Sequence, residues 1–359
     1  MKIAQVVSLV ESVPPQSKNG LEFIVSWLTE GLVQRGHDVT LFAPGNSKTH
    51  AHLKSLLPKG TSINIVPLNE MELDMAGFSF WNVMYAAHFA QDFDIIHCHN
   101  DGAAMVPYVK TPIIQTLHHP YKHEFLEPYL KLPEYAKTLD FITDQYSKIN
   151  YVTISKRQQE HFKQAEPFYF KKYTTIYNGI PLEQFSFNEH PQDYLFFIGY
   201  IRKDKGADVA VQVAKALNMK LILAGENKGQ EVFFKEHIEP YLNDKITYIG
   251  PVDFEQKNEL YKNAIATLAP LSWHEPFGLT LVESQACGTP VIAFNKGAAA
   301  EIIYHGKTGF VVNTIDEMCE AVKKIGEISR KNCREWVEKN FSIEKMVDEY
   351  EKFYTTLLQ

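Results

Sequence analysis

"KIAQVVSLVESVPPQSKNGLEFIVSWLTEGLVQRGHDVTLFAP", residues 2–44, predicts a strand, a helix and a second strand in succession. Its two ends, "KIAQVV" and "DVTLFAP", are apolar without clean alternation, which is typical of parallel strands covered on both faces. Between them, apolar residues recur with the spacing of one helix face: Leu21, Ile24, Val25, Leu28 and Leu32. Gly36 then ends the helix. The stretch is therefore a strand–helix–strand crossover unit of a parallel sheet.

The same pattern recurs along the whole chain. Further strands of the first half are expected at "INIVPL", "DIIHCH", "PIIQTLH", "YVTIS" and "TTIYNG". Those of the second half are expected at "YLFFIGY", "LILAGE", "ITYIG", "ATLAPLS", "PVIAF" and "GFVV", with helices in the gaps. We predict two doubly wound α/β domains, residues 1–180 and 181–340, with a helix at about 341–359 that packs back on the first domain. The polar segment 181–193, with two prolines, is interpreted as the linker.

Size and composition agree with two soluble domains. The chain has 359 residues, more than one core usually serves, and its 45% hydrophobic and 22% charged residues are typical of globular proteins. The net charge of −7 argues against nucleic acid as a partner. Four cysteines without a C-x-x-C spacing indicate reduced thiols, and no apolar run approaches ~18 residues. We expect a cytoplasmic protein, and contact with a membrane surface stays open.

A helix start in the second domain is the first candidate site. In "WHEPFGLTLVESQACGTPVIA", residues 273–293, a helix that begins near Gly278 directs the backbone N–H groups of Leu279 and Thr280 toward an anion. Glu275 precedes this helix and Glu283 lies about one turn inside it. Carboxylates accept hydrogen bonds from hydroxyls, which favours a sugar linked through phosphates to a ribose. The alternative is that Glu283 is solvated and Glu275 only stabilises the helix N-terminus.

A basic turn follows the first strand of this domain. "GYIRKDKG", residues 199–206, places Arg202 and Lys205 where they can neutralise a diphosphate whose charge grows as its bond to a sugar breaks. Lys203 and Asp204 are interpreted as solvated charges of a turn.

Histidines end two strands of the first domain. His99 and His118 are expected to face the ligand cleft, where an uncharged imidazole can donate to a sugar hydroxyl. His97 is expected to point the other way and to pack in the core. His119 and His123 either line the acceptor side or lie on the surface. A zinc site is not indicated, because no nearby Asp or Cys completes a ligand set.

Taken together, these motifs resemble the family-four glycosyltransferases, the retaining class with the GT-B fold. The resemblance includes "NGLEFIVSWLTEGLVQRGHDVTLFAP", "GYIRKDKG" and "LAPLSWHEPFGLTLVESQACGTPVIA", and covers nearly the whole chain. It implies that Lys205 binds the donor diphosphate, Glu275 the sugar hydroxyls and Glu283 the ribose. It also implies that His118 reaches the transferred sugar and that Gly20 approaches the phosphate.

The complete set of candidates divides into three groups. The catalytic candidates are His118, Lys205 and Glu275. The donor-binding candidates are Gly20, Arg202, Lys205, Glu275, Phe277, Gly278, Leu279, Thr280 and Glu283. The acceptor-side candidates are His99, Asn100 and His119. The sequence departs from the family at Asn19, where a glycine is usual, and at Tyr200, where an arginine is usual and for which Arg202 can substitute.

The predicted function is metal-independent and needs no cofactor, with retention of configuration. A hexose-type sugar passes from a nucleotide diphosphate sugar, with UDP favoured, to a hydroxyl of a glycan, lipid-linked or small-molecule acceptor. Because no acidic residue of the first domain, Asp101 included, has a clear claim to act as nucleophile, front-face transfer is favoured. The alternatives are a nucleotide-sugar epimerase of the same fold and a non-catalytic nucleotide-sugar binding protein.

Overall fold

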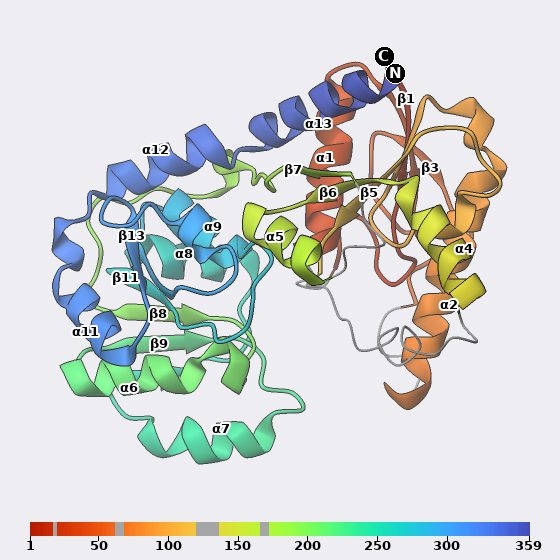
Figure 1. Cartoon of the computed structure of the whole chain (residues 1–359). Coiled ribbons are helices and arrows are strands. Elements are labelled where there is room, and N and C mark those ends of the chain that lie inside the picture. Colours follow the sequence, from red (N-terminus) through yellow and green to blue (C-terminus); the bar gives the residue numbers. More distant parts are fainter. Residues whose placement is uncertain (17–19, 62–67, 120–135, 166–171) are drawn as a thin grey trace. The chain divides into compact units, whose positions relative to one another are not determined.

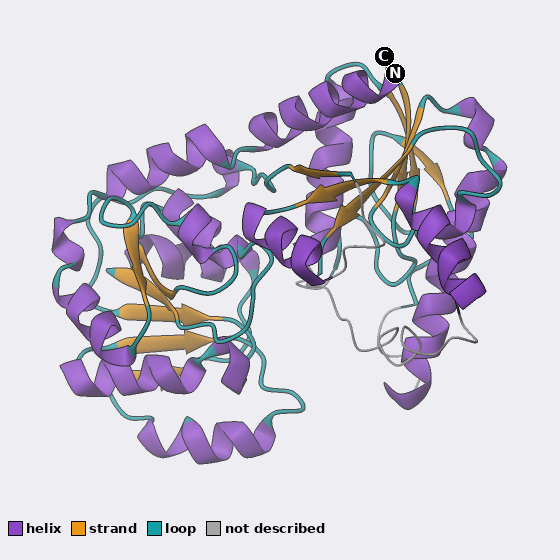
Figure 2. Ribbon diagram, viewed as in Figure 1, coloured by secondary structure: helices purple, strands orange, loops and turns teal. Residues whose placement is uncertain are grey.

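The chain folds into two compact units. Unit 1 comprises residues 1–179 and 343–359, and unit 2 comprises residues 180–342. The computed structural model describes residues 1–16, 20–61, 68–119, 136–165 and 172–359. Each unit has a parallel β-sheet with helices on both faces (Figure 1, Figure 2). The prediction of two doubly wound α/β domains is confirmed.

Within the described residues, unit 1 contains a seven-stranded sheet in the order β3-β2-β1-β4-β5-β6-β7. The strands are β1 (Lys2–Val6), β2 (Asp38–Phe42), β3 (His52–Lys54), β4 (Ile95–Cys98), β5 (Ile113–Leu117), β6 (Asn150–Thr153) and β7 (Tyr173–Thr175). The central strand β1 pairs in parallel with β2 and β4, so that Ile3 lies between Val39 and Ile95. Central strands are buried on both faces, which explains why their sequences do not alternate.

The helices of unit 1 include one from the far end of the chain. They are α1 (Gly20–Gln34), α2 (Leu68–His88), α4 (Ala136–Ser147), α5 (Lys156–Ala165) and α13 (Ile343–Leu358). Helix α13 packs along α1, and Figure 1 shows the blue helix beside the red one. Arg35, at the end of α1, pairs with Asp348 at 2.5 Å and with Glu351. His37 Nε2 lies 2.6 Å from Glu351 Oε1. Apolar packing and ion pairs thus hold the last helix on the first crossover helix.

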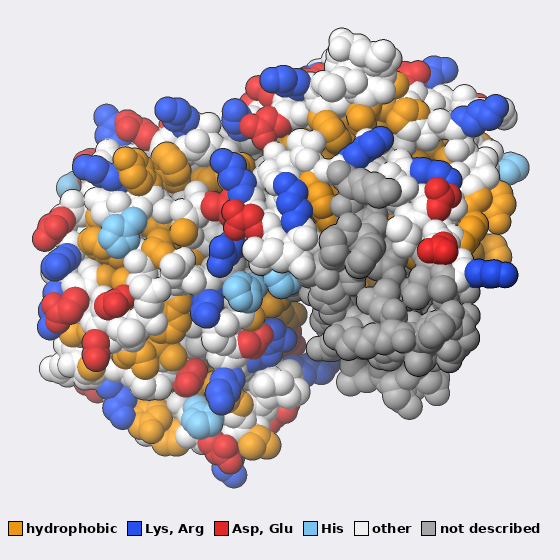
Figure 3. Space-filling model, in the orientation of Figure 1, with side chains coloured by type: hydrophobic (Ala, Val, Ile, Leu, Met, Phe, Trp, Pro, Cys, Tyr) orange, Lys and Arg blue, Asp and Glu red, His pale blue; other side chains and the backbone are white. Residues whose placement is uncertain are grey.

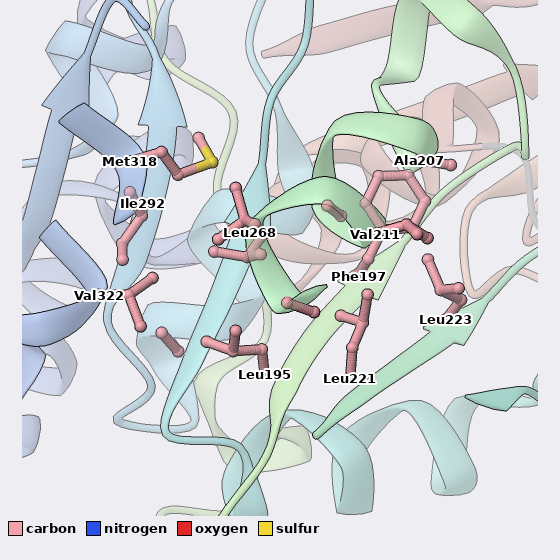
Figure 4. Close-up of a cluster of buried hydrophobic side chains, with 14 of the residues drawn as sticks. Leu195, Phe197, Ala207, Val211, Leu221, Leu223, Leu268, Ile292, Met318 and Val322 are labelled. Atoms are coloured by element: carbon pink, nitrogen blue, oxygen red, sulfur yellow. The ribbon is translucent and has the colours of Figure 1, made fainter. Parts of the chain in front are cut away.

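Unit 2 has a six-stranded sheet in the order β10-β9-β8-β11-β12-β13. Its strands are β8 (Leu195–Ile198), β9 (Leu221–Ala224), β10 (Ile246–Tyr248), β11 (Ala266–Ala269), β12 (Val291–Phe294) and β13 (Gly309–Val312). Its helices are α6 (Ala207–Leu217), α7 (Glu231–His237), α8 (Phe254–Asn263), α9 (Leu279–Ala286), α10 (Ala299–Ile302), α11 (Ile315–Lys323) and α12 (Arg330–Asn340). Figure 4 shows side chains of β8, β9, β11 and β12 packed against α6 and α11.

The segment predicted to be a linker, residues 181–193, is instead part of unit 2, so that prediction is wrong. Arg334 of α12 donates to the carbonyl oxygens of Leu182 and Phe185, and Arg330 donates to that of Asn188. The side chain of Phe185 is buried. Polar, proline-containing sequence therefore runs along α12 here because two arginines satisfy its backbone carbonyls.

In unit 1, one expected strand falls largely outside the described residues, and one observed strand was not expected. Residues 63–67 of the expected strand "INIVPL" lie outside the described residues, and its last residue, Leu68, begins α2. The short edge strand β3 was not predicted. Its three residues are exposed or half-buried, so they carry no hydrophobic signal.

The described surface is mixed in charge. Figure 3 shows acidic and basic side chains interspersed over the face in view. Among the described residues, no helix combines the length and the apolar character that crossing a bilayer requires.

Candidate functional site

The predicted helix start in unit 2 is confirmed. Helix α9 begins at Leu279, and Gly278 caps it with a φ of 93°, a left-handed conformation that glycine adopts without strain. The first backbone hydrogen bond at this end runs from Leu281 N to Gly278 O. Leu279 and Thr280, which precede that bond, are half-buried. Their backbone N–H groups thus stand at the positive end of the helix dipole, where an anion is favoured.

Lys205 and Glu275, two candidates far apart in the sequence, meet in the structure. Lys205 Nζ lies 2.8 Å from Glu275 Oε2 and 4.2 Å from the ring centre of Trp273. The side chains are 17% and 20% exposed, so the pair is sheltered and still accessible to a ligand. The contact arises because β8 and β11 are neighbours in the sheet, and the segments that follow them lie together. Ser272 N, for example, donates to Asp204 O at 2.9 Å.

The backbone of Glu275 is held by the loop after β12. Ala298 N donates to Glu275 O at 3.0 Å. Gly297 lies so close that a Cβ atom at that position would sit 2.1 Å from Glu275 O and 2.4 Å from Glu275 N. Its φ of 52° is also left-handed. Gly297 is therefore a positioning residue that the sequence analysis did not single out, because nothing local in the sequence marks a contact between the loops that follow β11 and β12.

Glu283 is buried and paired, which rules out the alternative of a solvated helix residue. It is 7% exposed, and its carboxylate accepts from Lys257 Nζ at 2.7 Å and from Tyr261 OH at 3.1 Å. Burial and the Glu283 carboxylate raise the pKa of Tyr261 well above its ordinary value, so the phenol keeps its proton. A carboxylate has about four acceptor sites, so two donors leave capacity for a ligand hydroxyl. Lys257 and Tyr261 share one face of α8, and no sequence pattern connects them with Glu283.

The charge of Arg202 is already partly compensated. Its Nε and one terminal nitrogen donate to the two carboxylate oxygens of Asp204 at 2.7 and 2.6 Å. The guanidinium also lies 5.8 Å from the ring centre of Tyr200. Asp204 is therefore an ion-pair partner, and its interpretation as a solvated turn charge is wrong.

The side chain of Phe277, another donor-binding candidate, is buried. It is 2% exposed and packs edge-on against Phe341, with ring centres 5.9 Å apart. It supports the loop before α9 from the core side.

In unit 1, the strand-end histidines form one cluster. His99 Nδ1 lies 2.9 Å from His118 Nε2, which brings together the two predicted cleft histidines. The prediction that His97 points away from His99 is wrong, because their rings are only 4.3 Å apart. Residues two apart on a strand project to the same face, which places both rings on one side of the sheet. His97 is fully buried, as predicted, and burial lowers its pKa to about 3.

The remaining candidates of unit 1 have separate environments. Gly20 is the first residue of α1, whereas Asn19 lies outside the described residues, as does His123. Asn100 Nδ2 donates to Ser79 O at 3.2 Å. His119 is exposed, and its carbonyl oxygen accepts from Gln158 Nε2.

Asp101, the acidic residue considered as a nucleophile, is engaged by its own unit. Its carboxylate accepts from Tyr146 OH and from Ala103 N. Across the described part of the chain, no three His, Cys, Asp or Glu side chains are grouped so that they could hold a metal ion.

Comparison with known proteins identifies the family. Residues 181–342 match the family described as Glycosyl transferases group 1, and residues 18–184 match Glycosyltransferase Family 4. The protein is thus a glycosyltransferase, an enzyme that transfers sugars. More particularly, the chain belongs to the family-four glycosyltransferases with the GT-B fold, as its motifs indicated.

Individual glycosyltransferases are similar to this protein over most of its length. An uncharacterized glycosyltransferase of Methanocaldococcus jannaschii is 25% identical over 345 residues, covering 87% of this chain and 85% of the relative. A D-inositol 3-phosphate glycosyltransferase of Acidothermus cellulolyticus is 24% identical over 341 residues, covering 83% and 75%. The crystal structure of Anabaena HepE in complex with UDP and glucose has a TM-score of 0.71 at 15% identity, covering 99% of this chain and 100% of that one.

Proposed function

We propose that the protein transfers a hexose-type sugar from UDP-sugar to a hydroxyl of a glycan, lipid-linked or small-molecule acceptor, with retention of anomeric configuration. The observation that carries the proposal is the pairing of Lys205 with Glu275 in front of α9. One cation, one carboxylate and a helix N-terminus there match the parts of a sugar diphosphate. A UDP donor is favoured because HepE, which shares the fold, was crystallised with UDP and glucose.

Lys205 and the start of α9 act on the diphosphate. As the bond from the anomeric carbon to the diphosphate oxygen breaks, negative charge grows on that oxygen. The Lys205 ammonium and the N–H groups of Leu279 and Thr280 stabilise this charge. The Glu275 carboxylate, now paired with Lys205, accepts hydrogen bonds from sugar hydroxyls once the diphosphate shares the ammonium.

Glu283 holds the nucleoside end. Lys257 and Tyr261 fix the orientation of its carboxylate, so a ribose with two hydroxyl donors meets an acceptor that is already in place. This contact does not change during the reaction, and it contributes to binding rather than to the chemical step.

Transfer is proposed to occur on one face of the sugar. The acceptor oxygen bonds to the anomeric carbon on the side from which the diphosphate departs, and the acceptor proton passes to a departing phosphate oxygen. No protein carboxylate takes part as a nucleophile in this route. His118 of unit 1 is proposed to contact a hydroxyl of the transferred sugar.

The test is a panel of nucleotide sugars incubated with the protein, first without acceptor. Slow hydrolysis of one donor identifies the base and the sugar, and an acceptor screen with that donor follows. NMR of the product then gives the anomeric configuration. An inverted product would overturn the proposed mechanism, and conversion of the donor into its epimer would replace transfer by epimerisation.

A further inference from the structure

A buried hydrogen-bond chain leads away from His118 into the core of unit 1. His118 Nε2 lies 2.9 Å from His99 Nδ1, and His99 Nε2 lies 2.7 Å from Gln5 Oε1. His99 is 5% exposed and Gln5 is fully buried. His118 is half-buried, so it is the member of the chain with access to a ligand.

The chemistry of these atoms determines which one donates and which one accepts in each hydrogen bond. An amide oxygen only accepts hydrogen bonds, so His99 Nε2 carries the proton that reaches Gln5 Oε1. Burial lowers the pKa values of His99 and His118 well below the ordinary value, which keeps both rings neutral. A neutral His99 with its proton on Nε2 has a bare Nδ1, which accepts from His118 Nε2–H. His118 is then left with an unprotonated Nδ1.

At the far end of this hydrogen-bond chain, the Gln5 amide nitrogen faces two atoms that can accept its protons. Gln5 Nε2 lies 3.4 Å from Tyr354 OH and 3.4 Å from His97 Nδ1. Tyr354 OH lies 2.7 Å from His97 Nδ1, and His97 Nε2 lies 2.7 Å from Thr116 Oγ1. With Tyr354 donating to His97 Nδ1 and His97 Nε2–H donating to Thr116, each of these donors meets an acceptor.

Helix α13 supplies the last side chains of this hydrogen-bond chain. Tyr354 belongs to this helix, and so does Tyr350, whose OH lies 2.8 Å from Thr116 Oγ1. Both tyrosines are buried. The C-terminal helix therefore takes part in orienting a group at the end of β5, far from it in the sequence.

We infer that Gln5 and His99 are positioning residues that hold His118 as the Nε2–H tautomer, so that His118 meets its ligand as a hydrogen-bond acceptor through Nδ1. The ligand group is then a hydroxyl and not a phosphate oxygen, which has no proton to donate at neutral pH. The inference rests on the proposed function only for the nature of this hydroxyl, which belongs to the transferred sugar. The tautomer itself is a property of unit 1 without any ligand.

The experiment measures the tautomer directly in the full-length protein. Two-bond ¹H–¹⁵N correlation spectra of histidine-labelled protein distinguish the two neutral forms, and the His118→Gln variant assigns the signal. We expect His118 to carry its proton on Nε2. A proton on Nδ1 would overturn the inference, and the tautomer itself is read from the spectrum of the unmodified protein.

Gln5→Met then tests the positioning role. It removes the acceptor of His99 Nε2–H at nearly constant volume, and we expect a mixture of His118 tautomers and about a tenfold lower kcat/KM, corresponding to ~1.4 kcal/mol. The matched control is Gln145→Met, a buried glutamine of the same unit whose side chain donates to Asp144. The control should leave the His118 signal unchanged.

The outcomes distinguish the positioning of His118 from its proposed contact with the sugar. An unchanged His118 tautomer in a folded Gln5→Met variant would overturn the positioning role. If the tautomer is as expected but His118→Gln keeps the full kcat/KM, the proposed sugar contact fails and the tautomer assignment stands.

Discussion

Removal of the Lys205 charge should impair the chemical step more than donor binding. In Lys205→Ala the proposed diphosphate site loses a cation, and the Glu275 carboxylate, 2.8 Å from the ammonium in the structure, loses its partner. Loss of one strong donor at developing negative charge costs ~2.7–4 kcal/mol, or about 10²–10³ in kcat. The unpaired carboxylate adds repulsion toward the phosphates, so we expect the upper part of this range.

Steady-state kinetics with the identified donor measure this effect. Because the two side chains touch, Lys205→Ala and Glu275→Gln should be non-additive, with an interaction energy of about 0.5–3 kcal/mol in a double-mutant cycle. Lys323→Ala is the matched control, since Lys323 pairs at 2.6 Å with Glu320 in an exposed pair of α11. Near wild-type turnover of Lys205→Ala, or strict additivity, would refute the assignment.

Four further outcomes are expected. Glu283→Gln should mainly raise KM for the donor, whereas Glu275→Gln should chiefly lower kcat, because only the sugar changes charge in the transition state; the same kinetic pattern in both variants would contradict this division. Gly297→Ala should lower kcat with the fold retained by circular dichroism, since its methyl group displaces the Glu275 backbone; unaltered kinetics would show that the contact is unimportant. Activity should survive EDTA, and loss that magnesium or manganese restores would count against a metal-independent reaction. Burial raises the pKa of Glu22 from 4.5 to about 7, so its contribution to stability is complete below pH 4.5 and is lost as the pH rises through 7. Glu22→Gln should therefore stabilise the protein more at pH 8 than at pH 5, and the two effects on the free energy of unfolding should differ by up to ~3 kcal/mol. Thermal unfolding at both pH values measures this difference, and an equal effect at both would exclude a buried, titrating carboxyl.

The parts of the candidate site that depend on neighbouring residues were predicted correctly from the sequence. The helix start at Gly278 was predicted because glycine, a preceding proline turn and apolar residues at helical spacing are neighbours in the chain. The same kind of local signal marked the strands of both sheets. It failed for β3, which is too short and exposed to show a pattern, and for segment 181–193, whose backbone carbonyls accept hydrogen bonds from arginines of α12.

By itself, then, the sequence determined the two α/β units, the family and the residues at the strand ends, because periodicity and turn residues act over a few positions. Only the tertiary structure determined which of these residues are in contact. Lys205 reaches Glu275 because β8 lies beside β11, and Gly297 meets the Glu275 backbone because β12 follows β11 in the sheet. His118 is joined to α13 because β1, β4 and β5 lie side by side, so that Gln5, His97 and Thr116 reach the tyrosines of the last helix. Such contacts depend on strand order and on long-range packing, and neither is written in any single stretch of the chain.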